Sequence, residues 1–224
     1  GALTEQLIVH GPLTVIEIEE RFCNDLSVRF PELKIINQDV RQVDLSELGP
    51  DLLVFGNLPY SFSTDIIFHL VRNRAFVSRA VLMLQREFAE RMAASPGGKD
   101  YGVLSISCQI AADVTLGGVI SGDSFHPRTE VESRLVELKF HKNDRFKIDD
   151  VTWFKRVVSA AFMMRRKMIR NSLRAANLVP IEELDKALSL AKINPMARPE
   201  TVSIEEFAGL ASILGDIKAR LAIA

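Results

Sequence analysis

Short apolar, β-branched runs that alternate with amphipathic stretches constrain the fold of this 224-residue chain more than any other feature. Runs of strand character lie at residues 13–18, 34–37, 51–55, 81–84 and 135–140. Helical periodicity lies between them at 19–29 and 65–74, and Ser63 and Thr64 are candidate caps for the second helix. Such alternation is typical of a parallel sheet covered on both faces. We therefore predict a doubly wound α/β domain up to about residue 140.

The chain changes character at residues 141–150, which are mostly polar. Beyond them the pattern is helical, with predicted helices over 151–176 and 180–191. Ser203 and Glu206 form a capping box that opens a last predicted helix, which extends to about residue 221. We therefore place a domain boundary near 145, with an α/β domain over 1–145 and a small all-helical domain over 146–224.

The composition, with 47% hydrophobic and 25% charged residues, is that of a globular protein and excludes disordered and fibrous classes. No apolar run approaches the roughly 20 residues that cross a bilayer, and the N-terminus lacks the pattern of a secretory leader. We expect a cytoplasmic protein without a membrane partner. Cys23 and Cys108 are too few for a disulfide framework and lack metal-ligand spacing, so we expect free buried thiols and no metal.

The net charge of −1 hides an uneven distribution. Residues 1–60 carry ten acidic and four basic side chains, whereas residues 151–177 carry seven basic ones and no acidic one. An unbalanced basic segment favours contact with nucleic-acid phosphates over a merely solvated face. Arg166, Arg170 and Arg174 would share one face of the predicted helix, with Lys167 at its edge. The candidate RNA-binding residues are Arg165, Arg166, Lys167, Arg170 and Arg174.

Two acidic residues follow predicted strands at positions where nucleotide sites use carboxylates. Glu17 ends the first run, where an acid can accept hydrogen bonds from ribose hydroxyls, and a solvated acid at a strand end is an equal alternative. Asp39 follows the second run and could accept from the amino group of a bound adenine. For Asp39 alone, a turn-forming role is the more common one.

The strongest local motif is Phe55-Gly-Asn-Leu-Pro-Tyr60, directly after a strand of buried type. Leu58 precedes a proline and is held extended, so its carbonyl can point into a cleft, and Asn57 adds a second neutral acceptor. Two acceptors beside the flat face of Tyr60 suit a flipped-out adenine. A structural turn that caps the strand is the alternative. Phe125, in the loop before the last strand, is a candidate second wall for the base, although packing is its more common role.

The ordered set of motifs resembles the KsgA-type ribosomal RNA adenine dimethyltransferases, and the likeness spans nearly the whole chain. The matching blocks are Thr14–Ile18, Gln38–Asp39, Phe55–Tyr60 followed by Ser63–Thr64, Leu84–Glu87, Tyr101–Ser105 and Ala161–Leu173. Single blocks are weak signals, but the ordered set is highly specific. The last block also distinguishes the chain from the related erythromycin-resistance methylases.

The resemblance implies a Rossmann-like, S-adenosylmethionine-dependent methyltransferase sheet with a C-terminal helical domain that binds RNA. The implied enzyme dimethylates the 6-amino groups of two adjacent adenosines near the 3′ end of small-subunit (16S) rRNA, in the context of small-subunit biogenesis. The implied partner is this rRNA within a 30S assembly intermediate, and we expect a monomer. By position, Glu17 matches the ribose-binding acid and Asp39 the acid at the cofactor adenine. Asn57, Leu58, Pro59 and Tyr60 match the target-adenine motif, and Phe125 matches the second stacking aromatic.

Two departures from the family pattern stand out. The family shows a glycine-rich block and a further N-terminal segment before the position of Gly1, so we expect an N-terminally incomplete catalytic domain in which Gly1 is the visible part of the cofactor-binding turn. The family's Pro-x-Pro-Lys-Val-x-Ser reads here as the segment from His126 to Ser133. A non-catalytic RNA-binding or ribosome-assembly factor on the same fold is the alternative function. A dehydrogenase lacks any candidate hydride site.

Overall fold

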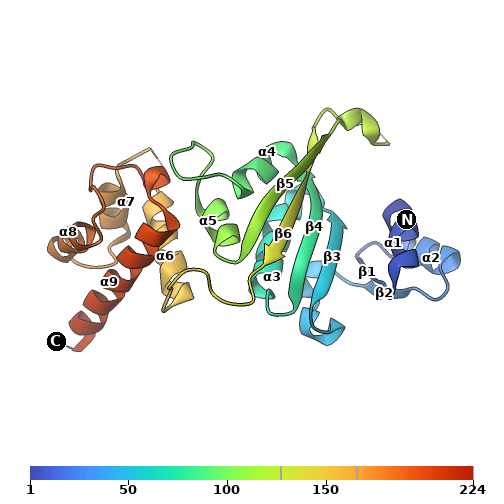
Figure 1. Ribbon diagram of the computed structural model, residues 1–224, viewed down its shortest axis with the longest axis horizontal. Coiled ribbons are helices and arrows are strands. Elements are labelled where there is room, and N and C mark those ends of the chain that lie inside the picture. Colours follow the sequence, from blue (N-terminus) through green and yellow to red (C-terminus); the bar gives the residue numbers. More distant parts are fainter. Residues whose placement is uncertain (127, 165, 224) are drawn as a thin grey trace.

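The computed structural model describes residues 1–126, 128–164 and 166–223. Figure 1 shows the C-terminal helices at one end of the molecule, a four-stranded sheet in the middle and the first two strands with their helices at the other end. The strands are β1 (Thr14–Glu17), β2 (Lys34–Asn37), β3 (Leu52–Asn57), β4 (Val77–Gln85), β5 (Ala112–Ile120) and β6 (Ser133–Phe140). The helices are α1 (Ala2–Leu7), α2 (Glu20–Arg29), α3 (Ser63–Arg72), α4 (Arg86–Met92), α5 (Val103–Gln109), α6 (Val151–Phe162), α7 (Ile169–Ala176), α8 (Ile181–Leu190) and α9 (Ile204–Ile223).

The main sheet has the order β3-β4-β6-β5. β3 and β4 run parallel, whereas β6 runs antiparallel to both β4 and β5. The sheet is therefore mixed, which corrects the expectation of a purely parallel one. β5 was not predicted, because Gly117 and Gly118 interrupt its apolar alternation and glycine disfavours strands. Its pairing along β6 supplies the stability that its sequence lacks.

β1 and β2 form a separate two-stranded parallel sheet in which Glu17 lies opposite Asn37. No ladder joins β1 to β3 within the described ranges. A doubly wound sheet would be continuous at this point, since the strand order reverses there. One face of β3 is correspondingly open, with Leu53 63% and Phe55 44% exposed. The strand predicted to be of buried type is thus exposed on one face and half-buried on the other.

The core of the α/β part lies between the main sheet and the helices that pack on it. Leu82 and Leu84 on β4 and Val136 and Leu138 on β6 are completely buried. Ile67 of α3 is buried in the same cluster. Buried and less buried residues alternate along β4 and β6, and the runs 81–84 and 135–140 that predicted these strands lie within them.

The helix predicted over 151–176 is divided into α6 and α7. Met168 has an extended backbone, and Ile169 begins the new helix with its amide donating to the carbonyl of Ala197 at 2.8 Å. Tertiary contacts of this kind override a helical sequence pattern. The predicted capping box is confirmed, because the Ser203 hydroxyl accepts from the Glu206 amide and the Glu206 carboxylate accepts from the Ser203 amide.

α5 contributes to two hydrophobic clusters. Leu104 and Cys108 face the core of the main sheet, whereas Ile106 packs with Tyr101 into the core of the C-terminal helices. Tyr101 also meets Phe162 edge-on, with ring centroids 6.4 Å apart. The two cores are therefore joined through one short helix. The domain boundary near residue 145 stays a prediction.

The thiols of Cys23 and Cys108 are free and buried, as expected from the sequence. Burial raises the pKa of the Cys108 thiol to about 12, which leaves it protonated and unreactive. Across the described residues, no helix is long and apolar enough to cross a membrane, and no group of three or more His, Cys, Asp or Glu side chains is arranged to hold a metal ion.

The Tyr101 hydroxyl gives a test of this packing, because it is buried without a hydrogen-bond partner among the described residues. Burial raises the pKa of this phenol. Tyr101→Phe is expected to keep the free energy of unfolding or raise it by about 1 kcal/mol, because the buried hydroxyl is removed and the ring stays. Tyr101→Ala should lower it by about 3–5 kcal/mol. Urea unfolding monitored by circular dichroism checks both, and a clear loss of stability in the Phe variant would contradict the assignment.

Candidate functional site

The segment that follows β3, Asn57–Tyr60, forms a corner whose backbone is fixed by hydrogen bonds. The Leu58 amide donates to the Met83 carbonyl at 3.2 Å, which extends the pairing of β3 with β4 by one residue. The Ser63 hydroxyl donates to the Pro59 carbonyl at 3.1 Å. Ser63 was predicted as a helix cap, but it is the first residue of α3 and binds the corner instead. The corner is thus tied both to the neighbouring strand and to the next helix.

Gly56 is required by the close packing at this corner. A Cβ atom at this position would lie 3.0 Å from the Leu58 side chain and 3.3 Å from that of Leu82. Contacts this short are tighter than ordinary van der Waals packing, so a side chain would push Leu58 away. The glycine therefore lets the Leu58 and Leu82 side chains pack closely against the end of the strand.

The corner presents two acceptors that the protein leaves unused. Within the part of the chain that the structure describes, neither the exposed Asn57 side chain nor the Leu58 carbonyl has a hydrogen-bond partner. Pro59 is exposed, and Tyr60 is 39% exposed in the turn that follows. An amide oxygen, a backbone carbonyl and an aromatic ring are therefore available to a ligand at one sheet edge.

Tyr60 is linked to the start of β6, because its hydroxyl lies 2.9 Å from that of Ser133. The loop between β5 and β6 carries Phe125, which is half-buried with an extended backbone. This loop closes tightly where the Thr129 amide donates to the Gly122 carbonyl, and a Cβ atom on Gly122 would overlap Thr129. The aromatic pairs found among the described residues do not include Tyr60 and Phe125. The role of Phe125 as a second stacking wall stays a prediction.

The carboxyl ends of β1 and β2 are joined by side-chain hydrogen bonds. The Asn37 amide donates to the carbonyls of Glu17 and Ile18 at 2.9 and 3.0 Å. One oxygen of the partly buried Glu17 carboxylate accepts from the Glu19 amide at 2.9 Å. The carboxylate is thus oriented by the backbone that follows it and retains capacity to accept further hydrogen bonds.

Asp39 is held by Arg41, a residue that sequence reasoning missed. The Asp39 carboxylate accepts from the Arg41 amide at 2.9 Å and from its guanidinium nitrogens at 2.5 to 3.0 Å. These hydrogen bonds lower the pKa of Asp39 to about 2, so the group is ionised at neutral pH. Asp39 follows β2, but the acceptors of its carboxylate are largely used within the chain, and its role at the cofactor stays a prediction. An Arg two residues after a candidate acid was the available signal.

Arg41 also connects the two sheets. Its guanidinium lies over the ring of Phe62 at 4.3 Å, and one of its nitrogens is 3.4 Å from the Asp65 carboxylate. Phe62 ends the turn that Tyr60 begins, and Asp65 belongs to the first turn of α3. The structure therefore brings Asp39 next to the turn that carries Tyr60, although β1 and β3 are not paired.

Gly1 precedes α1 and is exposed. Its nearest side chains are those of Arg29 and Leu26, and Arg29 forms an ion pair with Glu5 at 3.3 Å. α1 is therefore attached to α2, and the predicted contribution of Gly1 to a cofactor site stays a prediction.

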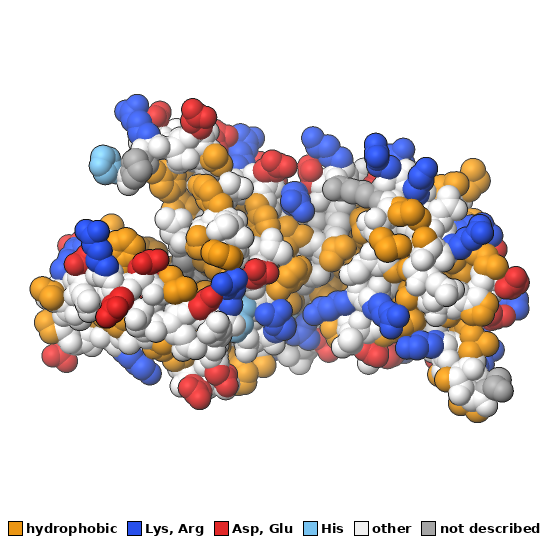
Figure 2. Space-filling model, turned by 180° about the vertical axis from the view of Figure 1, so that it is seen from behind, with side chains coloured by type: hydrophobic (Ala, Val, Ile, Leu, Met, Phe, Trp, Pro, Cys, Tyr) orange, Lys and Arg blue, Asp and Glu red, His pale blue; other side chains and the backbone are white. Residues whose placement is uncertain are grey.

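The basic segment is arranged differently from the prediction. Arg166 lies in the connection before α7, so it does not share a helix face with Arg170 and Arg174, which lie on α7. Arg166, Lys167 and Arg174 are exposed, and Arg165 lies outside the described residues. Figure 2 shows Lys and Arg side chains across the middle of one face and over the C-terminal helices.

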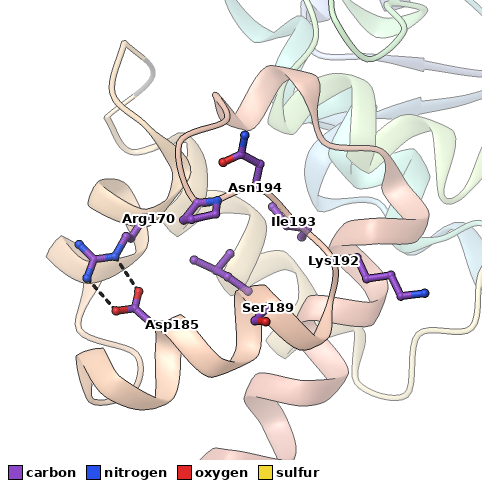
Figure 3. A pocket seen from close by; sticks show the side chains of 8 residues that line it. Arg170, Asp185, Ser189, Lys192, Ile193 and Asn194 are labelled. Carbon is purple, nitrogen blue, oxygen red and sulfur yellow. Dashed lines mark hydrogen bonds and ion pairs between the residues drawn. The ribbon is translucent and has the colours of Figure 1, made fainter.

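Arg170 is engaged within the protein. Its Nε and Nη2 atoms donate to the two carboxylate oxygens of Asp185 at 2.6 and 2.7 Å. This pair lines one side of an open cavity of about 600 Å³, with Lys192 and Asn194 on another part of its wall (Figure 3). A bidentate pair of this kind reduces the capacity of Arg170 to bind phosphate.

Comparison with known proteins assigns this chain to a family. The model of the family "Ribosomal RNA adenine dimethylase" matches residues 1–216. The chain is 40% identical over 220 residues to a ribosomal RNA small subunit methyltransferase A of Geobacter metallireducens, covering 94% of this chain and 80% of that protein. It is 37% identical over 222 residues to a protein of the same name in Myxococcus xanthus, covering 97% of this chain and 78% of that protein.

Two solved structures have a similar fold. A dimethyladenosine transferase from Plasmodium falciparum superposes with a TM-score of 0.69 at 22% identity, over 88% of this chain and 79% of that one. The 23S rRNA methyltransferase ErmE gives a TM-score of 0.63 at 20% identity, over 90% and 81% of the two chains. These likenesses support the methyltransferase fold, and together with the family match and the sequence relatives they show that this chain belongs to the ribosomal RNA adenine dimethylase family.

Proposed function

We propose that the protein is an S-adenosylmethionine-dependent methyltransferase that dimethylates the 6-amino groups of two adjacent adenosines near the 3′ end of small-subunit rRNA. The observation that carries the proposal is the corner after β3, where the Asn57 side chain and the Leu58 carbonyl are free to accept hydrogen bonds beside Tyr60. The 6-amino group of adenine has two hydrogens to donate, so two neutral acceptors match it.

The side chains at the carboxyl ends of β1 and β2 suit the nucleoside part of the cofactor. Glu17 keeps accepting capacity for ribose hydroxyls, and ionised Asp39 lies in the next loop of the same small sheet. When bound, S-adenosylmethionine supplies an electrophilic methyl group on a sulfonium sulfur. Asn57 at the end of β3 would border both this group and the target base.

The chemistry needs a better nucleophile than free adenine, because the lone pair of its 6-amino nitrogen is delocalised into the ring. Acceptors at Asn57 and Leu58 would take both amino hydrogens, favour a pyramidal nitrogen and direct its lone pair outward. Tyr60 would hold the ring by stacking, which fixes the approach geometry. A strong base is not required, because the amino proton becomes acidic once the nitrogen carries the new methyl group. A neutral Asn also places no carboxylate beside the cationic donor.

The same proposal covers the setting of the reaction. We place the protein in the cytoplasm as a monomer that acts on rRNA within a 30S assembly intermediate, with the basic segment 151–177 contacting phosphates. A non-catalytic assembly factor on this fold is the second candidate. The unused acceptors at the corner favour an enzyme, because a pure binder has no use for them at a donor pocket. Calorimetric titration of the full-length protein discriminates, since a full-length chain that binds RNA but not S-adenosylmethionine would favour the factor.

Asn57→Ala tests the central assignment. We expect kcat for adenine methylation to fall by about 100- to 1000-fold, as on removal of one preorganised hydrogen-bonding group from an active site. Cofactor affinity, measured by calorimetry, should stay within a few fold. Mass spectrometry of rRNA from unmethylated small subunits gives the dimethyladenine yield. Asn143→Ala, at an exposed asparagine, serves as the control, and normal dimethylation by the Asn57 variant would contradict the proposal.

Arg41→Ala tests how the cofactor-side acid is held. The pKa of Asp39 should return from about 2 towards the ordinary value of about 3.9. A carboxyl that is more acidic in the folded state stabilises it above its ordinary pKa, and this contribution is lost as the pH falls through about 4 to about 2. As the pH falls from about 4 to about 2, the free energy of unfolding should therefore decrease less steeply in the variant than in the wild type. Carboxyl NMR titration measures the pKa, with Arg21→Ala as control, and an unchanged value would contradict the pairing.

Salt dependence of RNA binding tests the basic segment. Arg166→Ala and Lys167→Ala should each reduce the slope of log K against log salt by about 1, as expected for loss of one phosphate contact. Asp185→Asn, which removes the carboxylate from Arg170, should instead strengthen binding. Filter binding to a small-subunit rRNA fragment at several salt concentrations measures all three. Unchanged slopes in both alanine variants would exclude these side chains from the interface.

A further inference from the structure

One hydrogen bond at the corner connects segments far apart in the sequence. The hydroxyls of Tyr60 and Ser133 lie 2.9 Å apart, and 73 positions separate the two residues. Tyr60 is 39% exposed, whereas Ser133 is 1% exposed. A buried hydroxyl in the main sheet therefore holds the tip of a partly exposed aromatic ring.

Ser133 has a fixed position in the sheet. It is the first residue of β6 and pairs with Gln85 on one side and with Ile120 on the other. A residue within two ladders has little freedom to move, because backbone hydrogen bonds constrain it from both sides.

The neighbours of Ser133 strengthen this anchor. Arg86 donates to the Glu132 carboxylate at 2.8 Å and to that of Glu90 at 2.9 Å, and Arg134 also donates to Glu90 at 2.9 Å. The Arg86 amide donates to the Glu132 carbonyl at 2.9 Å. A network of ion pairs from α4 thus clamps the residues on both sides of Ser133.

The residue type at position 133 also points to the hydroxyl. A buried strand position favours apolar or β-branched side chains, and an unpaired buried hydroxyl is costly. The partner that the structure gives the Ser133 hydroxyl is Tyr60. Its hydrogen bond to Tyr60 accounts for a polar side chain at this place in the sheet.

We propose that Ser133 is a positioning residue that fixes the ring plane of Tyr60 for stacking against the target adenine. The inference rests on the proposed function of the corner. The backbone of Tyr60 is held by the hydrogen bonds of Leu58 and Pro59, and Ser133 holds the other end of the side chain. With both ends fixed, the ring does not swing away from the free acceptors, so less freedom is lost when a base binds.

A double-mutant cycle tests the coupling through kinetics with unmethylated small subunits and S-adenosylmethionine. Ser133→Ala and Tyr60→Phe should each lower kcat/KM by about three- to tenfold, the range expected for one hydrogen bond, and the double variant should be no worse than either. Ser107→Ala, at another buried serine, is the matched control. If Ser133→Ala lowers kcat/KM by the same factor in the Tyr60→Phe background as in the wild type, the role of Ser133 is merely structural and the proposal is overturned.

A second measurement does not depend on turnover. The chain has two tyrosines, so carbon-13 labelling of the tyrosine ring gives separate signals for Tyr60 and Tyr101. Ser133→Ala should shift the Tyr60 signal alone and weaken binding of adenosine monophosphate, followed at that signal, by about three- to tenfold. Unchanged binding overturns the proposal. If Ser133→Ala weakens binding of adenosine monophosphate but the wild-type protein does not methylate RNA, the positioning role is supported and the proposed reaction is refuted.

Discussion

The antiparallel placement of β6 between β4 and β5 is the constraint on which the rest of this structure depends. The interior of β6 supplies Val136 and Leu138 to the core of the main sheet. Its first residue reaches the corner after β3, so the strand that closes the core also holds the tyrosine beside the free acceptors. The same register serves stability and site geometry. A slip of one residue would turn the buried side chains outward and would also remove the hydroxyl from the tyrosine.

The sequence allowed most elements and the central motif to be predicted, because these features are local. Short runs of strand character made β4 and β6 visible, and the Asn-Leu-Pro-Tyr corner could be recognised from its backbone and acceptor chemistry. The failures have tertiary causes. β5 contains glycines and depends on its partner strand, and the helix pattern across 163–168 yields to contacts with a distant loop. Arg41 and Ser133 act through spatial neighbours, which a single sequence does not show.

The candidate site is distributed over two sheets that share no ladder in the described structure. Glu17 and Asp39 belong to the small sheet, whereas Asn57 and Tyr60 belong to the edge of the main one. Arg41 is one contact between them, because it binds Asp39, covers the ring of Phe62 and approaches Asp65, and Ile16 and Ile36 of the small sheet also pack against the core of the main one. An arginine in this position neutralises Asp39, and its planar fork suits it to several partners at once.

The two-sided packing of α5 has a consequence for how the molecule responds to heat. Leu104 and Cys108 on one side and Ile106 on the other commit a single two-turn helix to both hydrophobic clusters. If either cluster unfolds, apolar side chains of α5 become exposed to water, and the other cluster needs this helix in place. The cooperative unit therefore extends across both parts of the chain, and a ligand that binds at either end raises the melting temperature of the whole.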